Sequence, residues 1–280
     1  MRHLPGMLSY DLAEARPVLE RASARETAAR VALGVLAEAL LDQVAGVGLV
    51  SHVVSVGGQR ATASVLPTPA DEAALCEASM RALDPADNAR FEAAVDAAKH
   101  AGDTIGGVAE VIAYGVPVGL GTHVSARERL DARLAAGLMS IQSVKGVEIG
   151  DGFAQAALLG SQAHDEIVHG PDGHLTRTSN HAGGIEGGTS NGSPIIARAA
   201  FKPISTVPRA LRSVDLATGE EAVGLHQRSD TCQVVPGAVI AEAEVALVLA
   251  DALFEHAGGR SVKEMRRNLE AYLSVVGERA

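Results

Sequence analysis

Two arginines flank a serine that can cap a helix, and this arrangement could hold an anion. Arg21-Ala22-Ser23-Ala24-Arg25 precedes an alanine-rich run, and Glu26 follows Ser23 at the spacing of a capping box. A helix N-terminus presents unpaired N–H groups and partial positive charge, so Arg21 and Arg25 beside it would suit a phosphate. An ordinary capped surface helix explains the same local pattern.

Two later segments also combine charge with hydroxyl groups. Lys202-Pro203-Ile204-Ser205-Thr206 offers a cation and two hydroxyls in a turn directly after a β-like run, a set that suits phosphate. A plain strand exit is the alternative for this segment. Arg228-Ser229-Asp230 lies on a loop before a long apolar helix, where functional side chains are often displayed, although a surface ion pair explains it as well.

The stretch from Ser179 to Gly192 reads SNHAGGIEGGTSNG, which suits either a flexible linker or a backbone that lies close to a ligand. Its last five residues match the G-x-S-x-G pattern of a hydrolase nucleophile, centred on Ser190. That pattern needs a strand before the serine and a helix after it. Here a glycine-rich loop precedes Ser190 and a β-like run with Pro194 follows, so the sequence disfavours a hydrolase.

Other generic motifs are incomplete. His164 and His169 flank two acidic residues, but their spacing of five does not place them on one helix face, so we predict a polar loop and no metal site. Gly119-Leu120-Gly121 is not completed to G-x-G-x-x-G, and no phosphate-binding G-x-x-x-x-G-K-[ST] motif occurs. Classical nucleotide-binding folds are therefore unsupported.

The elements that must position these residues mix helices and strands without regular alternation. Apolar spacing predicts helices at 23–44, 85–101, 125–137, 238–256 and 262–276, and strands at 49–56, 108–114 and 194–201. Residues 209–223 read as a hairpin around Ala217-Thr218-Gly219. The capping pattern puts Arg21 and Ala22 in the loop before the first helix. The pattern favours an α+β fold with helices packed on an antiparallel sheet.

Composition narrows the class of partner. The net charge of −10 over 280 residues argues against nucleic acid, and with 2% aromatic residues and no Trp there is little for bases to stack on. No apolar stretch is long enough to span a membrane, so we expect a soluble protein. The two cysteines, Cys76 and Cys232, are far apart and match no ligand spacing, which favours a reduced cytoplasmic setting.

Five segments in this order make the chain resemble chorismate synthase. The resemblance runs from Met7 to the C-terminus and is carried by ERASARETAARVALG (20–34), IQSVKGVEIGDGF (141–153), SNHAGGIEGGTSNG (179–192), AFKPISTVPRAL (200–211) and HQRSDTCQVVPGAVIAEA (226–243).

The resemblance implies a single domain over residues 1–280, a β-α-β-α-β sandwich, a homotetramer and a reduced FMN cofactor. It also implies the last step of the shikimate pathway, in aromatic amino acid biosynthesis. In that step a lyase removes phosphate from 5-enolpyruvylshikimate 3-phosphate by 1,4-anti elimination, without net redox change. The flavin would be reduced either by NADPH or by an external reductase.

The resemblance also implies roles for particular residues. Arg25 and Arg228 would bind the anionic substrate, with Arg228 between it and the flavin, and Asp230 would assist proton transfer near flavin N5. The FMN contacts would come from Arg21, Ala22, Ser23, Gln142, Ser143, Gly187, Lys202, Pro203, Ile204, Ser205, Thr206 and Arg228.

The chain departs from the family pattern in two places. The family's first quarter to third, with a G-E-S-H-G-type and an R-P-G-H-A-D-type motif, has no counterpart before Met7, so we expect a chain whose N-terminal portion is missing. A catalytically impaired flavin-binding remnant that lacks the N-terminal histidines and arginines is the alternative to an active lyase. The second departure is Glu244, where the family usually has an apolar residue.

Overall fold

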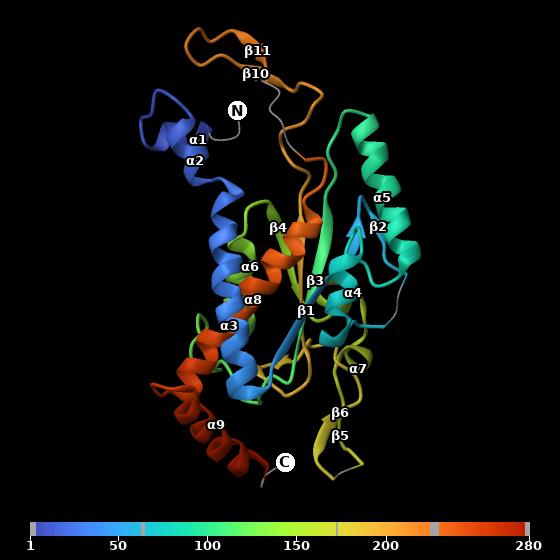
Figure 1. Ribbon diagram of the computed structural model, residues 1–280, viewed down its shortest axis with the longest axis vertical. Coiled ribbons are helices and arrows are strands. Elements are labelled where there is room, and N and C mark those ends of the chain that lie inside the picture. The colour runs from blue at the N-terminus through green and yellow to red at the C-terminus, as the bar shows by residue number, and fades with distance from the viewer. Residues whose placement is uncertain (1–3, 63–64, 172, 225–229, 278–280) are drawn as a thin grey trace.

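A five-stranded antiparallel sheet organises the fold, in the order β2-β1-β3-β9-β4. The computed structural model describes residues 4–62, 65–171, 173–224 and 230–277 (Figure 1). The strands are β1 (Gly48–Val56), β2 (Gln59–Arg60), β3 (Gly107–Tyr114), β4 (Val144–Ile149) and β9 (Ile195–Phe201). Side chains alternate between the two faces, so Ala109 and Val111 enter the main core while Glu110 and Ile112 lie on the opposite face.

The strand register defines two ends of this sheet. At the first, which we call the Phe201 end, Phe201 pairs with Gly107 on one side and with Val144 on the other. At the second, the Ile195 end, Ile195 pairs with Ala113 of β3. β1, β3, β4 and β9 run in this direction, whereas the two-residue β2 pairs with Ser55 and Val56 near the Phe201 end. A residue next to a terminus of one of the four longer strands can therefore be assigned to one end.

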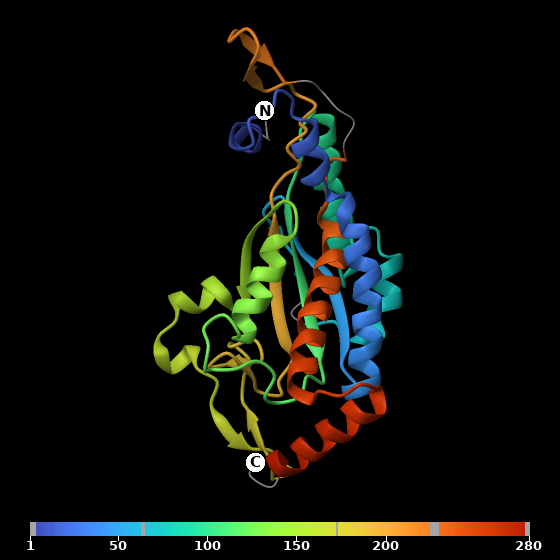
Figure 2. The same ribbon diagram turned by 90° about the vertical axis from the view of Figure 1, so that its left-hand side faces the viewer.

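Long helices cover one face of the sheet: α3 (Thr27–Ala45), α6 (Leu130–Ser140) and α8 (Val234–Ala257), with α9 (Val262–Gly277) beyond them (Figure 2). Small residues let these elements approach closely. A Cβ added to Gly34 of α3 would lie 2.4 Å from the Ala243 side chain of α8, and one added to Gly237 would lie 2.8 Å from the Phe201 ring. The buried core consequently runs from Ala37 in α3 to Leu269 in α9.

The opposite face is covered in part by α4 (Glu72–Glu77) and α5 (Pro85–His100) (Figure 1). Leu75 of α4 packs there on Val50 and Ile112 of the sheet. On this face the Nε2 of His52 lies 2.8 Å from Glu110, whose other oxygen accepts from Nε of Arg198 at 2.6 Å. The buried carboxylate of Glu110 is thus paired on both sides, as a buried charge must be.

Smaller elements extend beyond both ends of the sheet. Past the Phe201 end lie α1 (Leu4–Ser9), α2 (Arg16–Arg21) and the hairpin β10–β11 (Arg212–Val214, Glu221–Val223) (Figures 1 and 2). After β4 the chain forms η3 (Gly152–Ala157), α7 (Gly160–Ala163) and the hairpin β5–β6 (Ile167–His169, Leu175–Arg177). Short segments complete the set: η1 (Ala24–Glu26), η2 (Pro69–Asp71), β7 (Ile185–Glu186) and β8 (Thr189–Ser190).

The α+β class with an antiparallel sheet is confirmed, as are the strands predicted at 49–56, 108–114 and 194–201. Three helix starts were predicted wrongly, by four or five residues each. The helix expected from Ser23 begins as a 3₁₀ turn and becomes α-helical only at Thr27. The helix expected from Ser125 begins at Leu130, because Arg129 has a ψ of 135°, outside the helical range. The helix expected from Ala238 begins one turn earlier, at Val234. Arg21 is the last residue of α2 and does not lie in a loop. Among the described helices, none could cross a membrane.

Candidate functional site

The segment Arg21-Ala22-Ser23 lies at the Phe201 end, between α2 and α3 (Figure 1). Ser23 is extended and its Oγ accepts a hydrogen bond from the backbone N–H of Arg25 at 3.3 Å, so it caps the 3₁₀ turn. The predicted capping box does not form, because the Glu26 carboxylate accepts from Arg30 and Gln142 instead. Arg21, Ala22 and Arg25 are exposed, so both cationic groups are available to a ligand.

Gln142 and Ser143 form the turn between α6 and β4 at the same end of the sheet. Ser143 has a φ of 73°, in the left-handed region, which costs a non-glycine residue about 1 kcal/mol. Its carbonyl oxygen accepts from the backbone N–H of Lys202 at 3.0 Å. This bond joins the predicted FMN contacts at Gln142 and Ser143 directly to those that begin at Lys202.

The segment from Lys202 to Thr206 leaves β9 and is held by two long-range hydrogen bonds. Gln233 donates through Nε2 to the Lys202 carbonyl at 3.1 Å, and the Thr104 hydroxyl donates to the Ile204 carbonyl at 2.6 Å. The Lys202 and Pro203 side chains are exposed, whereas Ser205 and Thr206 are half-buried. A cation and two hydroxyls therefore lie beside the turn formed by Gln142 and Ser143.

Asp230 is placed near these segments by the contacts of the next residue, Thr231. The Thr231 carbonyl accepts from the backbone N–H of Ile105 at 2.9 Å, one residue along from the contact between Thr104 and Ile204. The side chain of Asp230 is exposed, which leaves its carboxylate open to a bound ligand. Arg228, predicted to contact both flavin and substrate, lies outside the described residues.

Gly187 is the one described residue of the predicted set that lies elsewhere. The neighbouring Gly188 carbonyl accepts from the backbone N–H of Leu130 at 2.9 Å, where α6 begins, whereas Gln142 follows the end of α6. A helix of 11 residues spans about 16 Å, so this length separates Gly187 from Gln142. Gly187 has a φ of 60°, and no atom lies within 4 Å of where its Cβ would be.

The rest of the glycine-rich stretch is packed against backbone at the Ile195 end. Ser190 is buried, and its hydroxyl donates to the Pro117 carbonyl at 2.6 Å and accepts from the Leu120 N–H at 2.8 Å. The hydroxyl thus makes both hydrogen bonds within the protein. The element after Ser190 is the strand β9 and not a helix, so the G-x-S-x-G match lacks the context of a nucleophile elbow, as predicted. A Cβ on Gly183 would lie 2.3 Å from the backbone nitrogen of Gly150, so a side chain is excluded there.

His181, in the same stretch, forms a pair with a carboxylate. Its Nδ1 lies 2.5 Å from Oδ2 of Asp151, and this hydrogen bond raises the pKa of the imidazole above its usual value. Asp165, from the polar segment with metal-like composition, accepts from the Ser179 hydroxyl and from the backbone N–H groups of His181 and Ala182. The Asp165 carboxylate therefore holds the loop in shape.

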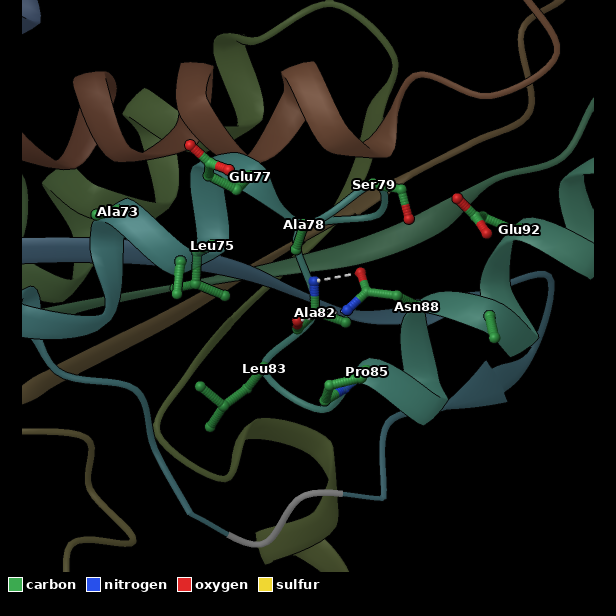
Figure 3. A pocket seen from close by; sticks show the side chains of 12 residues that line it. Ala73, Leu75, Glu77, Ala78, Ser79, Ala82, Leu83, Pro85, Asn88 and Glu92 are labelled. Atoms are coloured by element: carbon green, nitrogen blue, oxygen red, sulfur yellow. Dashed lines mark hydrogen bonds between the residues drawn. The ribbon is translucent and has the colours of Figure 1, made fainter.

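A hollow of about 780 Å³ lies between α4 and α5, away from the predicted residues (Figure 3). Its walls are largely alanine and leucine. The Asn88 side chain, which points into the turn at Ala82, accepts from the Met80 and Ala82 N–H groups and donates to the Ala82 carbonyl. None of the predicted site residues lines the hollow, and the Asn88 amide is hydrogen-bonded within the protein. The hollow is therefore not the candidate site.

Sequence reasoning missed the residues that hold Gln142 in place. The pairing of Glu26 with Arg30 is visible as an i,i+4 charge pair, and that spacing could have been preferred to the capping box. The contact of Glu26 with Gln142 joins residues 116 positions apart and leaves no local signal.

Comparisons with known proteins show which family this chain resembles. A family model described as chorismate synthase matches residues 3–254. Chorismate synthases from Beutenbergia cavernae and from a Nocardioides species are each 58% identical to this chain, over 276 and 273 residues. The matches cover 98% of this chain, 70% of the Beutenbergia protein and 69% of the Nocardioides protein.

A solved structure supports the same assignment at the level of the fold. The crystal structure of a chorismate synthase superposes with a TM-score of 0.83 at 37% identity, covering 98% of this chain and 76% of the other. The family match extends over most of the chain, and the fold agrees. This chain therefore belongs to the chorismate synthase family, whose members are lyases.

Proposed function

We propose that this chain eliminates phosphate from 5-enolpyruvylshikimate 3-phosphate in the 1,4-anti sense to give chorismate, the last step of the shikimate pathway, with reduced FMN at the Phe201 end. The observation that carries the proposal is the convergence of separate family segments at one place. Residues 21–25, 142–143, 202–206 and 230 come from four parts of the chain. Lys202 is bonded directly to Ser143, and the other two segments are connected through their neighbours, Glu26 to Gln142 and Thr231 to Ile105. Thr104, next to Ile105, is bonded to Ile204.

The residues at the Phe201 end fit a flavin phosphate and an isoalloxazine ring. Arg21, the capped turn at Ser23, Lys202 and the hydroxyls of Ser205 and Thr206 offer cations and donors for the phosphate. The Gln142 Oε1 atom is buried and has no hydrogen-bond donor in the protein, so it is an acceptor for a ring N–H group. The flavin role of Gly187 stays a prediction, since this residue lies at the Ile195 end.

In the proposed reaction a C–O bond to phosphate breaks and the hydrogen at C6 leaves, so the elimination involves no net redox change. Bound reduced FMN would supply electron density to the substrate as phosphate departs. Arg25 would bind an anionic group of the substrate, together with Arg228. The exposed Asp230 carboxylate would accept and release a proton beside the flavin.

The reductant and the assembly belong to the same proposal. We propose that FMN is reduced either by NADPH or by an external reductase, and that the protein acts as a homotetramer. The resemblance to the family suggests both, and size-exclusion chromatography with light scattering tests the second.

The function is tested by mixing the purified protein anaerobically with reduced FMN and substrate and following phosphate release. We expect phosphate and chorismate in equal amounts, and no turnover when the flavin is oxidised. The Beutenbergia cavernae chorismate synthase serves as the positive control. Absence of phosphate release under conditions in which that enzyme turns over would overturn the proposed function.

A further inference from the structure

The side-chain amide of Gln142 has one fixed orientation. Its Nε2 donates to Oε1 of Glu26 at 2.8 Å. A carboxylate only accepts hydrogen bonds, so the nitrogen of the amide must face Glu26 and the carbonyl oxygen must point the other way. The contact with Glu26 therefore decides which half of the amide is left for another partner.

Glu26 is itself held by Arg30, whose guanidinium also contacts two other helices. Its Oε1 also accepts from Nε of Arg30, one turn further along α3, at 3.1 Å. The Nη1 of Arg30 donates to the Ser140 hydroxyl at the end of α6, at 2.6 Å, and to Oε2 of Glu244 in α8, at 2.9 Å. The hydrogen bond from Gln142 and the charge of Arg30 together hold the pKa of Glu26 below its usual value, so Glu26 stays an acceptor at neutral pH.

Glu244 gives this network an anchor in the helix layer. Its side chain is only 13% exposed and that of Arg30 is 22% exposed, so both charges are largely withdrawn from water. Such a pair fixes geometry better than a solvated surface pair does. Glu244 therefore ties Arg30, and through it Glu26, to α8.

The carbonyl half of the amide is unsatisfied. Gln142 Oε1 is buried and finds no donor among the described residues. Buried polar atoms almost always have a partner, so an unpaired acceptor in a site indicates a donor that comes with the ligand. The ring of reduced flavin carries several N–H groups and is a donor of the required kind.

We propose that Glu26 is a positioning residue that acts through Gln142. It holds the amide so that Oε1 accepts a hydrogen bond from a ring N–H of reduced FMN, with Arg30 and Glu244 keeping Glu26 in place. This inference rests on the proposed function, because it takes reduced FMN as the ligand of the Phe201 end.

The test is a double-mutant cycle on cofactor binding. Reduced FMN is titrated anaerobically by calorimetry into the wild-type protein, Glu26→Ala, Gln142→Ala and the double variant. We expect each single substitution to raise Kd about tenfold and the double variant to match Gln142→Ala, because Glu26 has no amide left to position. Equal effects of Glu26→Ala in both backgrounds would overturn the inference, as would an unchanged Kd in the single variants.

Two further variants separate positioning from stability. Glu26→Gln keeps an acceptor for the amide nitrogen and should bind within about threefold of wild type. Glu20→Gln removes an exposed carboxylate on α2 that pairs only with Arg16 among the contacts described, and it should leave Kd unchanged. Thermal melting of each variant shows whether it is folded. If the wild-type protein itself binds no reduced FMN, the proposed function falls, and this inference with it.

Discussion

The two ends of the sheet use polar residues in different ways. At the Phe201 end the cations of Arg21, Arg25 and Lys202 are exposed, and one buried acceptor on Gln142 lacks a donor. At the Ile195 end Ser190 is fully hydrogen-bonded, and Gly183 leaves no room for a side chain. Exposed cations and an unpaired acceptor thus lie together at the Phe201 end, whereas around Ser190 and Gly183 satisfied hydroxyl bonds and close backbone contacts hold the loop in shape.

The largest expected effect is the loss of activity when Asp230 at the Phe201 end is replaced, with the fold intact. Asp230→Asn removes the proposed proton acceptor, so phosphate release should slow by about 10² to 10⁴-fold. The side chain is exposed, so the melting temperature should stay unchanged. Steady-state rates and FMN titrations measure this, and equal losses in rate and in FMN affinity would contradict a role in proton transfer.

At the Ile195 end we expect the opposite result. Gly183→Ala places a methyl group 2.3 Å from the Gly150 nitrogen at a φ of 63°, so clash and backbone strain together should lower the free energy of unfolding by about 3 kcal/mol. Urea unfolding followed by circular dichroism measures it.

Gly187→Ala is the matched control, since it has a similar φ of 60° but open space around the added methyl group. Its free energy of unfolding should fall by only about 1 kcal/mol. Its Kd for FMN should remain within about twofold of wild type if the flavin stays at the Phe201 end, because about 16 Å separate it from Gln142. A tenfold weaker Kd would show that this end also reaches a flavin.

A smaller effect tests the hydroxyl of Ser190. Ser190→Ala leaves the Pro117 carbonyl and the Leu120 N–H without their partner, so the free energy of unfolding should fall by about 1 to 3 kcal/mol. The turnover rate at saturating substrate should not change, measured at a temperature where the variant is fully folded. Complete loss of turnover in a folded variant would indicate a catalytic serine after all.

The smallest effect depends on pH. Asp151 raises the pKa of His181 above 6.5, so the protonated pair stabilises the fold below that pH and the contribution is lost as the pH rises through the folded pKa. His181→Gln should therefore be less stable than wild type at about pH 5.5, and the difference should shrink toward about pH 9. Urea midpoints at both pH values check this, and a difference that grows with pH would contradict it.

The fold was more predictable from the sequence than the site. Residues 49–56 and 108–114 are apolar and β-branched, and they were recognised as strands because burial produces that pattern. The strand Val144–Ile149 was missed, since Lys145, Gly146 and partial exposure hide its alternation. The site segments were assigned by resemblance to a family, and their grouping depends on contacts such as Lys202 with Ser143, which no local pattern encodes.

The position of β9 between β3 and β4 also bears on how the chain folds. Strand β4 precedes β9 in sequence but is joined to the sheet only through it. During synthesis one edge of β3 and one edge of β4 stay unpaired until residue 201 has left the ribosome. The reason is that β9, the strand that pairs with both, is the last strand of this sheet to be made. Pairings between distant segments slow folding and leave strand edges open meanwhile, so this chain should fold slowly and depend on protection from aggregation.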